Sequence, residues 1–553
     1  MTRLAALRSE IADVQASGRL PLATDRSGVR NEVRRSPAAP GEAAFPLRNV
    51  QVASNATFRR AVIERFSESA GAAATDHLST SDPENSARRL FTGPQQAVLI
   101  ASVITAFAAF VSAPITSLVA LNALATAYLI ITILFRGYLA ASVYGEPYSP
   151  TASASGEDGL QDEDLPIVTI LLPLFREGDS LPTLARAIAS FDYPKHKLDV
   201  KLILEESDTG TREEAIALGL DTEWEIVIAP PSQPQTKPKA CNFALAFAEG
   251  GLTVIYDAED EPAPDQLRKA AAVFEHADDD LVCVQARLNF YNPRENWLTR
   301  LFALEYALWF DSLMPALRRL GAPIPLGGTS NVFRTNKLRE LGAWDPYNVT
   351  EDADLGLRIA RKGYRTELID SSTLEEANCR LGNWLRQRSR WMKGYIQTWI
   401  VDLRNPARGA NGSLLRGLAS SQLFIAGTVI SALLNPILWG VFAVWLATRS
   451  PAIALAFPEP LLSLNLFALL FGNALFIFMA MIAPLKRGWS DLSPAAWFMP
   501  VYWWLMSFAA YMAVWQLIRR PHFWEKTNHA LSVDARARRK EAVAALQAES
   551  DGR

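Results

Sequence analysis

Arginine, glutamine and tryptophan side chains stand together in one short stretch of the chain, Gln387-Arg388-Ser389-Arg390-Trp391. Two acidic clusters precede this stretch, Asp257-Ala258-Glu259-Asp260 and Thr350-Glu351-Asp352. The planar guanidinium group of arginine binds phosphate oxygens in pairs, and the indole of tryptophan offers a flat face to a sugar or a base. Carboxylates suit a divalent metal or act as proton acceptors. These residue types indicate chemistry on a phosphorylated, sugar-like substrate.

The size and composition of the chain limit what kind of protein it is. At 553 residues it is too long for one ordinary domain, so at least two parts are expected. A formal net charge of -3 gives no sign of nucleic-acid binding. The three cysteines, Cys241, Cys283 and Cys379, lack the spacing of a metal site, and we expect reduced thiols in the cytosol.

Apolar residues are concentrated in two blocks, 96–140 and 418–518. Pro114 divides the first block into two stretches without charges, each close to the length of about 20 residues that crosses a membrane. Arginines flank both sides of this block, which favours a hairpin with both ends in the cytoplasm. The leader 1–90 is rich in Ala, Ser, Arg and Pro, and we expect it to be mostly disordered.

The second block contains three apolar stretches, 418–447, 460–483 and 494–518. A helix over the first would be about 45 Å long, longer than a hydrocarbon core of about 30 Å, so tilting, a kink at Pro436 or a break is expected. Three crossings would place the basic tail 519–553 outside the cell, against the positive-inside tendency. We therefore expect a cytoplasmic tail, with four crossings or a re-entrant segment in this block.

Strand and helix patterns alternate between the two apolar blocks. Residues 167–173, 200–204 and 254–256 read as buried strands, and 180–190 as a helix, which predicts a mostly parallel sheet with crossover helices. In such sheets the ligand binds beyond the carboxyl ends of the strands. The acidic residues that follow these strands should share one rim, namely Glu205, Glu206, Asp208, Asp257 and Glu259.

Each motif also has a purely structural interpretation when taken alone. The cluster at Asp257 could be a solvated strand end, and Thr350 could be the N-cap of the helical pattern that follows it. The stretch Lys237-Pro238-Lys239 could be a basic loop that enters a helix. The basic, aromatic segment 384–399 could only anchor the protein at a membrane surface.

The order and spacing of these motifs resemble those of the family 2 membrane glycosyltransferases, the group of cellulose, hyaluronan, chitin and poly-N-acetylglucosamine synthases. The resemblance covers about 115–530, and the segments 327–334 and 344–352 look closest to the bacterial XagB-like glycosyltransferases. It implies an α/β GT-A (Rossmann-like) cytosolic domain inserted between transmembrane helices of a bacterial inner membrane, with interfacial amphipathic helices. The expected parts are the GT-A domain at 165–380, interfacial helices at 381–416 and the apolar helices at 418–518.

The resemblance also implies roles for individual residues. Asp257 and Glu259 match the DxD motif that holds Mg²⁺ or Mn²⁺ on the diphosphate, although the second acid here is glutamate with Asp260 beside it. Asp352, next to Glu351, matches the catalytic base, and Arg390 would contact the leaving diphosphate. The nucleotide-sugar pocket would include Pro173, Glu177, Glu206, Asp208, Lys239, Asn242 and Gln387. The acceptor would meet Trp391, Gly328, Thr329 and Ser330.

The segment Phe523-Trp524-Glu525-Lys526-Thr527 resembles the gating loops that close over the nucleotide in cellulose and hyaluronan synthases. An equally simple interpretation is an aromatic, basic end of a membrane helix. If Phe523, Trp524, Lys526 and Thr527 do form a gate, the tail must lie in the cytoplasm.

The function that the resemblance implies is inverting transfer of a sugar from a nucleotide-diphosphate sugar, UDP-linked most simply, to a growing β-linked polysaccharide with coupled secretion. The alternative is transfer of one sugar to a membrane lipid, because lipid glycosyltransferases share much of this motif set. A third interpretation, a channel or scaffold with a degenerate transferase domain, is disfavoured by the intact Asp257, Asp352, Arg390 and Trp391. No partner beyond the donor, the acceptor and membrane lipids is implied.

Overall fold

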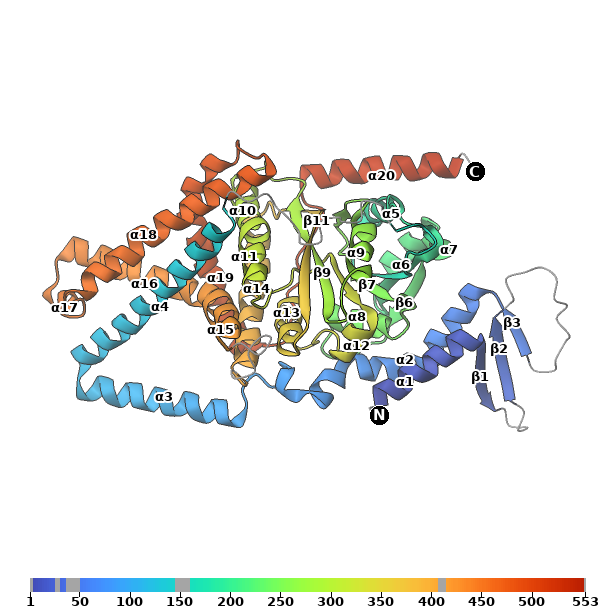
Figure 1. Ribbon diagram of the computed structural model, residues 1–553, viewed down its shortest axis with the longest axis horizontal. Coiled ribbons are helices and arrows are strands. Elements are labelled where there is room, and N and C mark those ends of the chain that lie inside the picture. The colour runs from blue at the N-terminus through green and yellow to red at the C-terminus, as the bar shows by residue number, and fades with distance from the viewer. Residues whose placement is uncertain (1–2, 25–29, 36–49, 145–159, 406–413, 552–553) are drawn as a thin grey trace.

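A computed structural model describes residues 3–24, 30–35, 50–144, 160–405 and 414–551 of the chain. A domain built on one large sheet lies between long apolar helices on one side and an N-terminal module on the other (Figure 1). The first and last described segments both contact this domain.

The large sheet has eight strands in the order β6-β5-β4-β7-β10-β9-β11-β8. Four neighbouring strands are parallel, whereas β10 runs antiparallel to both its neighbours and β8 antiparallel to β11. The prediction of an α/β fold is confirmed, with a mixed sheet in place of a mostly parallel one. The strand bounds are β4 Val168–Leu174, β5 Leu198–Glu205, β6 Glu225–Ala229, β7 Leu252–Ile255, β8 Glu261–Pro262, β9 Leu281–Phe290, β10 Asn331–Arg334 and β11 Arg365–Glu375.

Both faces of this sheet are buried, because successive apolar side chains along its strands pack in two different hydrophobic clusters. Leu171 and Ile203 pack in one hydrophobic cluster with α8 (Lys237–Leu245) and α13 (Glu351–Arg361). Ile170 and Leu202, one position earlier, pack in another with α5 (Leu181–Ala189) and α9 (Gln266–Glu275). Because successive side chains on a strand point to opposite faces, such runs need helices on both sides. The remaining helices of the domain are α6 Thr209–Ala217, α7 Leu220–Glu223, α10 Trp297–Leu308, α11 Met314–Arg319, α12 Thr335–Glu340 and α14 Leu381–Asp402.

Five helices among the described residues are long and apolar enough to cross a membrane. The first pair is α3 (Gly93–Ser112) and α4 (Pro114–Ser142), and their junction at Pro114 is the one expected from the sequence. The long stretch after residue 418 contains a π-helical segment, Ala419–Ile425, followed by α16 (Ala426–Thr448), which continues through Pro436. The other two long helices contain α18 (Leu461–Ile482) and α19 (Met499–Arg519), and the short helices α15 (Leu414–Leu418) and α17 (Pro451–Leu455) lie before and after α16.

The N-terminal segment differs from the prediction of a mostly disordered leader. Its described residues form α1 (Arg3–Ser17), a small sheet of β1 Arg19–Thr24, β2 Arg30–Arg35 and β3 Val50–Ala53, and α2 (Asn55–Ser81). Along α2, apolar residues recur every four positions and are buried, namely Phe58, Val62, Phe66, Ala70, Ala74 and Leu78. This stripe packs in the same hydrophobic cluster as α8. The prediction of disorder was based on the average composition of this segment, which is polar. It did not consider that the apolar residues of α2 recur at helical spacing.

The C-terminal segment returns to the domain built on the large sheet. Its helix α20 (Val533–Asp551) lies along the same side of the domain as α5 (Figure 1). Arg538 forms an ion pair with Glu261, and Arg539 Nη2 lies 2.6 Å from Asp179 Oδ1. The basic residues of the tail therefore bind acidic groups of the domain.

Candidate active site

One cavity of about 700 Å³ brings together most of the residues singled out in the sequence. It opens at the carboxyl ends of β4, β5 and β7 and extends to α10, α14, the first turn of α16 and Met506 of α19. The predicted residues that line it are Pro173, Glu177, Asp257, Glu259, Gly328, Thr329, Glu351, Asp352, Gln387, Arg390, Trp391, Phe523, Trp524, Lys526 and Thr527. The cavity thus joins motifs that are up to 350 residues apart in the chain.

The acidic cluster after β7 forms a tight turn at one end of the cavity. Asp260 is buried, and its Oδ2 accepts hydrogen bonds from the backbone nitrogen of Asp257 at 2.7 Å and from Thr329 Oγ1. Asp260 therefore shapes the turn and does not line the cavity, whereas Asp257 and Glu259 do. Burial and the neighbouring Asp257 raise the pKa of Asp260 well above its ordinary value.

Lys237, in the first turn of α8, faces this acidic cluster. Its Nζ lies 2.5 Å from Asp257 Oδ1 and donates a hydrogen bond to the Gly328 carbonyl at 2.9 Å. Burial alone would lower the pKa of Lys237, but the nearby Asp257 and Glu351 raise it, so Lys237 is a cation. The site contains a fixed positive charge between the two acidic motifs.

Glu351 and Asp352 occupy the first turn of α13. Thr350 is the N-cap residue as expected, but its side chain makes no capping hydrogen bond and packs against Gly394 of α14. Burial raises the pKa of Asp352. Burial, with ionised Asp352 beside it, raises the pKa of Glu351 to about 8. Asp352 accepts a hydrogen bond from the Ala353 backbone nitrogen at 2.8 Å, which favours its ionised form.

The helix α14 brings the glutamine, arginine and tryptophan of the third motif to the cavity. Gln387 accepts a hydrogen bond from Asn378 at 3.3 Å. Burial lowers the pKa of Arg390, and the nearby carboxylates of Glu351, Asp352 and Asp257 offset part of that effect. Trp391 stacks near Tyr306 of α10, with 6.4 Å between ring centroids. Although they are neighbours in sequence, Arg390 lies near carboxylates and Trp391 lies against aromatic rings.

The segment after α19 covers the acidic end of the cavity. The Trp524 ring lies 4.5 Å from the Arg390 guanidinium, and Lys526 Nζ lies 3.6 Å from Glu177. His529 Nδ1 lies 2.5 Å from Glu259 Oε2. Burial alone would lower the pKa of His529, but Glu259 raises it to about 9, while burial raises the pKa of Glu259 to about 7 against the effect of His529.

Five residues predicted for the site do not line the cavity. Glu206 is exposed beyond the end of β5, and Asp208 caps α6 by accepting a hydrogen bond from the Thr211 nitrogen. Lys239 binds Glu205, and Asn242 binds the Trp344 backbone, so both hold neighbouring elements together. Ser330 hydrogen-bonds Thr373 within the sheet. Adjacent residues of an extended chain point to opposite faces, so a motif match one position away can select the wrong side chain.

Several residues that line the cavity were outside the predicted pocket, although Glu205 was expected on the same rim. Glu205, rather than Glu206, points into it, and Lys237, rather than Lys239, contacts Asp257. Glu305, Tyr306, Glu375 and His529 also line it. Glu205 and Lys237 belong to motifs that the sequence analysis recognised. No motif near the other four residues in the sequence indicates that they line a cavity.

The donor atoms of this region fit a divalent cation. Oxygens of Glu259 and Glu376 and a ring nitrogen of His529 lie within 4.8 Å of one another, and Asp257 is two residues from Glu259. Asp260 Oδ1 is buried without a hydrogen-bond partner among the described residues. A set made mainly of carboxylate oxygens suits Mg²⁺ or Mn²⁺.

Comparison with known proteins agrees with this arrangement. Residues 252–524 match the model of the family described as glycosyl transferase family group 2. An N-acetylglucosaminyltransferase from a Rhizobium species is 25% identical over 290 residues, covering 50% of this chain and 62% of the relative. A beta-monoglucosyldiacylglycerol synthase from Trichormus variabilis is 26% identical over 250 residues, covering 44% and 52%.

The chain therefore spans less than two thirds of the length of each of these relatives. Among solved structures, a mannosyltransferase from Pyrobaculum calidifontis in complex with GDP-mannose and Mn²⁺ aligns with a TM-score of 0.47 at 20% identity, over 72% of this chain and 99% of the other. The motifs, the sheet and the matched region agree, and the predicted GT-A fold is confirmed in a chain whose residues 252–524 match glycosyl transferase family group 2.

Proposed function

We propose that this protein transfers a sugar, with inversion, from a nucleotide-diphosphate sugar to an acceptor hydroxyl at a membrane surface. The observation that carries the proposal is the single cavity that joins Asp257 and Glu259 to Asp352 and Trp391. A donor diphosphate fits the end with Arg390, Lys237 and the metal-type carboxylates, because cations stabilise the charge that develops on the leaving group. We infer that the nucleotide of the donor is UDP.

Asp352 is the base in this proposal. It lies against Gly328, where an added Cβ would come within 3.2 Å of its Oδ2, so a small acceptor group can approach this carboxylate. An ionised Asp352 takes the proton of the acceptor hydroxyl as that oxygen attacks the anomeric carbon, and the bond to the diphosphate breaks on the opposite face. Glu351, with its higher pKa, stays protonated while Asp352 ionises.

Asp257 and Glu259 would hold Mg²⁺ or Mn²⁺, with His529 and Glu376 within reach of Glu259. When bound, the cation would neutralise negative charge on the diphosphate. The covering segment of Phe523, Trp524, Lys526 and Thr527 acts as a gate in this proposal, because the nucleotide must enter where Trp524 contacts Arg390 and Lys526 approaches Glu177.

The acceptor enters from the aromatic end of the cavity. Tyr306, Trp309 and Phe310 of α10 and the adjoining turn line this end together with Trp391. Aromatic faces bind the apolar faces of sugar rings, which favours a growing polysaccharide as the acceptor, with the product leaving through the apolar helices. A lipid is the second candidate, because Thr428 of α16 and Met506 of α19 also line this end and one similar protein is a beta-monoglucosyldiacylglycerol synthase.

We further propose that four of the five apolar helices cross the inner membrane, with the domain in the cytoplasm. Both α4 and α18 end at the domain, where Ser142 and Val143 accept hydrogen bonds from Arg319 and Lys486. Helices α3 and α16 begin near it, and α17 lies at the far end of the molecule (Figure 1).

Helix α19 does not cross in this proposal, because both of its ends contact the domain or the segment that covers its cavity. Tyr502 binds Glu305 at 2.5 Å near one end, and Gln516 binds Glu525 at 2.7 Å near the other. A thiol placed at Thr448 should react only with an external, impermeant reagent, and one at Ser490 only after the membrane is permeabilised. Equal external labelling of both positions would contradict the four-crossing topology.

The test of the function is turnover by the purified full chain with Mn²⁺ and a panel of UDP-glucose, UDP-N-acetylglucosamine, UDP-galactose and GDP-mannose. Release of nucleotide diphosphate identifies the donor, and sizing of the labelled product identifies the acceptor class. A polymer supports polysaccharide synthesis, whereas a single-sugar adduct of diacylglycerol supports the lipid alternative. Absence of nucleotide release with every donor would refute transfer from these four donors.

A further inference from the structure

Arg388 stands at a variable position of the QxxRW motif and has no role in the chemistry proposed above. Its side chain is buried, with 4% of the residue exposed. On an α-helix, residues two apart point in nearly opposite directions, whereas residues three or four apart share a face. Arg388 therefore points away from Arg390 and lies on the same face of α14 as Trp384 and Trp391.

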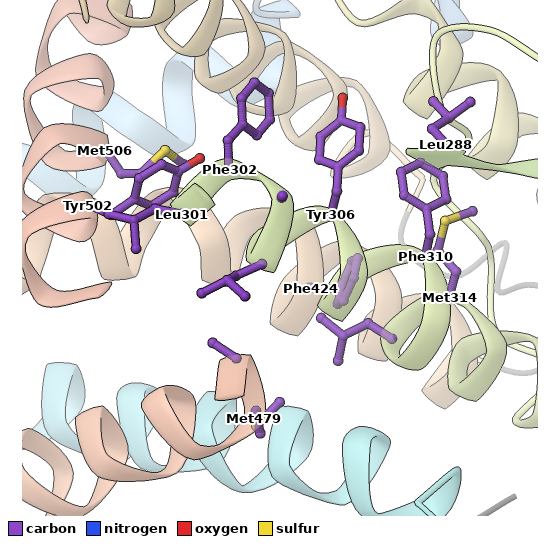
Figure 2. Close-up of a cluster of buried hydrophobic side chains, with 14 of the residues drawn as sticks. Leu288, Leu301, Phe302, Tyr306, Phe310, Met314, Phe424, Met479, Tyr502 and Met506 are labelled. Atoms are coloured by element: carbon purple, nitrogen blue, oxygen red, sulfur yellow. The ribbon is translucent and has the colours of Figure 1, made fainter. Parts of the chain in front are cut away.

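Aromatic rings enclose the Arg388 guanidinium group. Its central carbon lies 4.4 Å from the ring centroid of Phe302 and 4.4 Å from that of Trp391. The rings of Trp384 and Tyr502 lie farther away, at 5.6 and 5.9 Å. Figure 2 shows Phe302 and Tyr306 projecting from α10, with Tyr502 approaching from a separate helix. A planar cation can stack on two rings at once, which the ammonium group of lysine cannot do.

The edge of the same guanidinium group binds a carboxylate and a phenol. Arg388 Nη1 lies 3.2 Å from Glu305 Oε1, and Nη2 binds Glu305 Oε2 and the Tyr502 hydroxyl, the latter at 2.8 Å. Tyr502 in turn donates to Glu305 Oε2 at 2.5 Å. Arg388 thereby links three helices, α10, α14 and α19. Burial alone would lower the pKa of Arg388, but Glu305 raises it, so the group is charged.

Trp391 reaches the cavity, and Arg388, Glu305 and Tyr306 of the same arrangement line it as well. The Trp391 ring lines the aromatic end, with Arg388 stacked on it at 4.4 Å and Tyr306 beside it at a centroid distance of 6.4 Å and an interplanar angle of 25°. The orientation of the indole follows from where the buried guanidinium group is fixed. A guanidinium fixed by Glu305 and Tyr502 leaves the Trp391 ring little freedom to tilt.

We propose that Arg388 is a positioning residue for the acceptor, and that it acts by holding the Trp391 ring through the Phe302–Arg388–Trp391 stack and the Glu305–Tyr502 network. This inference rests on the proposed function, because it assumes that the acceptor meets Trp391. It assigns Arg388 to acceptor binding and Arg390 to the donor diphosphate, although only one residue separates them.

The test compares Arg388→Lys with Arg386→Lys in the full-length protein. Arg386 is exposed on the same helix, so its replacement is a matched control. The donor is the nucleotide sugar that the wild type turns over, and the acceptor probes are a short β-linked gluco-oligosaccharide and dioleoylglycerol in detergent micelles. Arg388→Lys should raise the KM for the acceptor by about tenfold while the KM for the donor changes less than twofold. Arg386→Lys should change neither.

Two further variants make the assignment independent of a folding defect. Tyr502→Phe removes one hydrogen bond of the network and keeps the ring, so it should raise the acceptor KM in the same direction by about twofold to threefold. In Arg388→Ala, added guanidinium ion at millimolar concentration should restore the acceptor KM, whereas methylammonium should not. A purely structural role of Arg388 predicts equal losses with donor and acceptor and no selective rescue.

The outcomes separate this inference from the function on which it rests. If the wild type releases nucleotide but Arg388→Lys changes the donor KM, or leaves the acceptor KM unchanged, the positioning role is wrong and the transferase function stands. If the wild type releases no nucleotide with either acceptor probe, the proposed function fails and the positioning role fails with it. A selective rise in the acceptor KM supports both.

Discussion

The two ends of the cavity are built in different ways. At the acidic end, Asp257 and Asp352 stand directly after a strand and in the first turn of a helix, so the backbone places them. At the aromatic end, Trp391 is positioned by side chains from α10 and α19, through stacking and a buried ion pair. Charged residues placed by the end of a strand or the start of a helix can be recognised as short sequence motifs. The orientation of an aromatic ring that packs between helices depends on contacts between residues that are distant in the sequence.

This difference predicts that single substitutions at the two ends fail in different ways. A change at the acidic end should remove chemistry or metal-dependent donor binding and leave acceptor binding intact. A change at the aromatic end should weaken acceptor binding and leave the donor unaffected.

The largest effect is expected for Asp352→Asn, which removes the base without changing its shape. Turnover should fall by about 10³-fold, because general-base catalysis contributes on that scale. Binding of the nucleotide diphosphate, measured by calorimetry, should stay within a few fold of the wild type. Turnover close to that of the wild type would disprove the role of Asp352.

The second largest effect is expected for Asp257→Asn. The loss of a charged metal ligand should weaken Mn²⁺-dependent donor binding by about 100-fold, measured by titration of the nucleotide with and without Mn²⁺. Asp265→Asn is the control, because Asp265 lies eight residues later and pairs only with Lys269 among the described ion pairs. An unchanged metal dependence in Asp257→Asn would remove Asp257 from the metal site.

A smaller and selective effect is expected for Trp391→Ala. The acceptor KM should rise by about tenfold, the scale of one lost stacking contact, with the donor KM unchanged. Trp399→Ala provides the comparison, because Trp399 is on the same helix and hydrogen-bonds Gln422 at 2.9 Å outside the cavity. Equal effects on donor and acceptor in Trp391→Ala would abolish the distinction between the two ends.

The smallest effect is a shift in the pH profile. A base acts in its ionised form, and burial raises the pKa of Asp352, so turnover should decline on acidification at a higher pH than an exposed aspartate would give. Glu351, with a pKa of about 8, ionises after Asp352. Glu351→Gln should therefore shift the pH of half-maximal turnover on the acid side by no more than about half a pH unit, because Glu351 is still protonated where Asp352 titrates. A lost acid limb would make Glu351 the base.

Much of the fold followed from local patterns in the sequence. The runs before Asp257 and around Leu171 predicted strands, and β7 and β4 confirm them. The apolar stretches flanking Pro114 predicted two helices, which α3 and α4 confirm. The N-terminal segment was mispredicted, because the stripe from Phe58 to Leu78 is masked by small and polar residues, and its helix is stabilised by packing against α8.

The site was only partly accessible from sequence. Predicted residues on the strand ends and the helix N-terminus line the cavity, whereas Glu206 and Lys239 do not and the nearby Glu205 and Lys237 do. A motif fixes position along the chain, and the direction of a side chain depends on how the strand or helix is seated in the fold. His529 and Glu305 could not be found, because nothing near them in the sequence shows which cavity they meet.

By itself, the sequence determined the residue types, the alternation of strands and helices, and the two apolar blocks. These follow from local spacing, since strand and helix periods and membrane-length apolar runs are properties of neighbouring residues. The tertiary structure decided which carboxylates share a cavity, that the tail returns to cover Glu259 and Arg390, and that Arg388 is enclosed by rings from α10 and α19. Those contacts join residues far apart in the chain, and their geometry is fixed only when the helices pack.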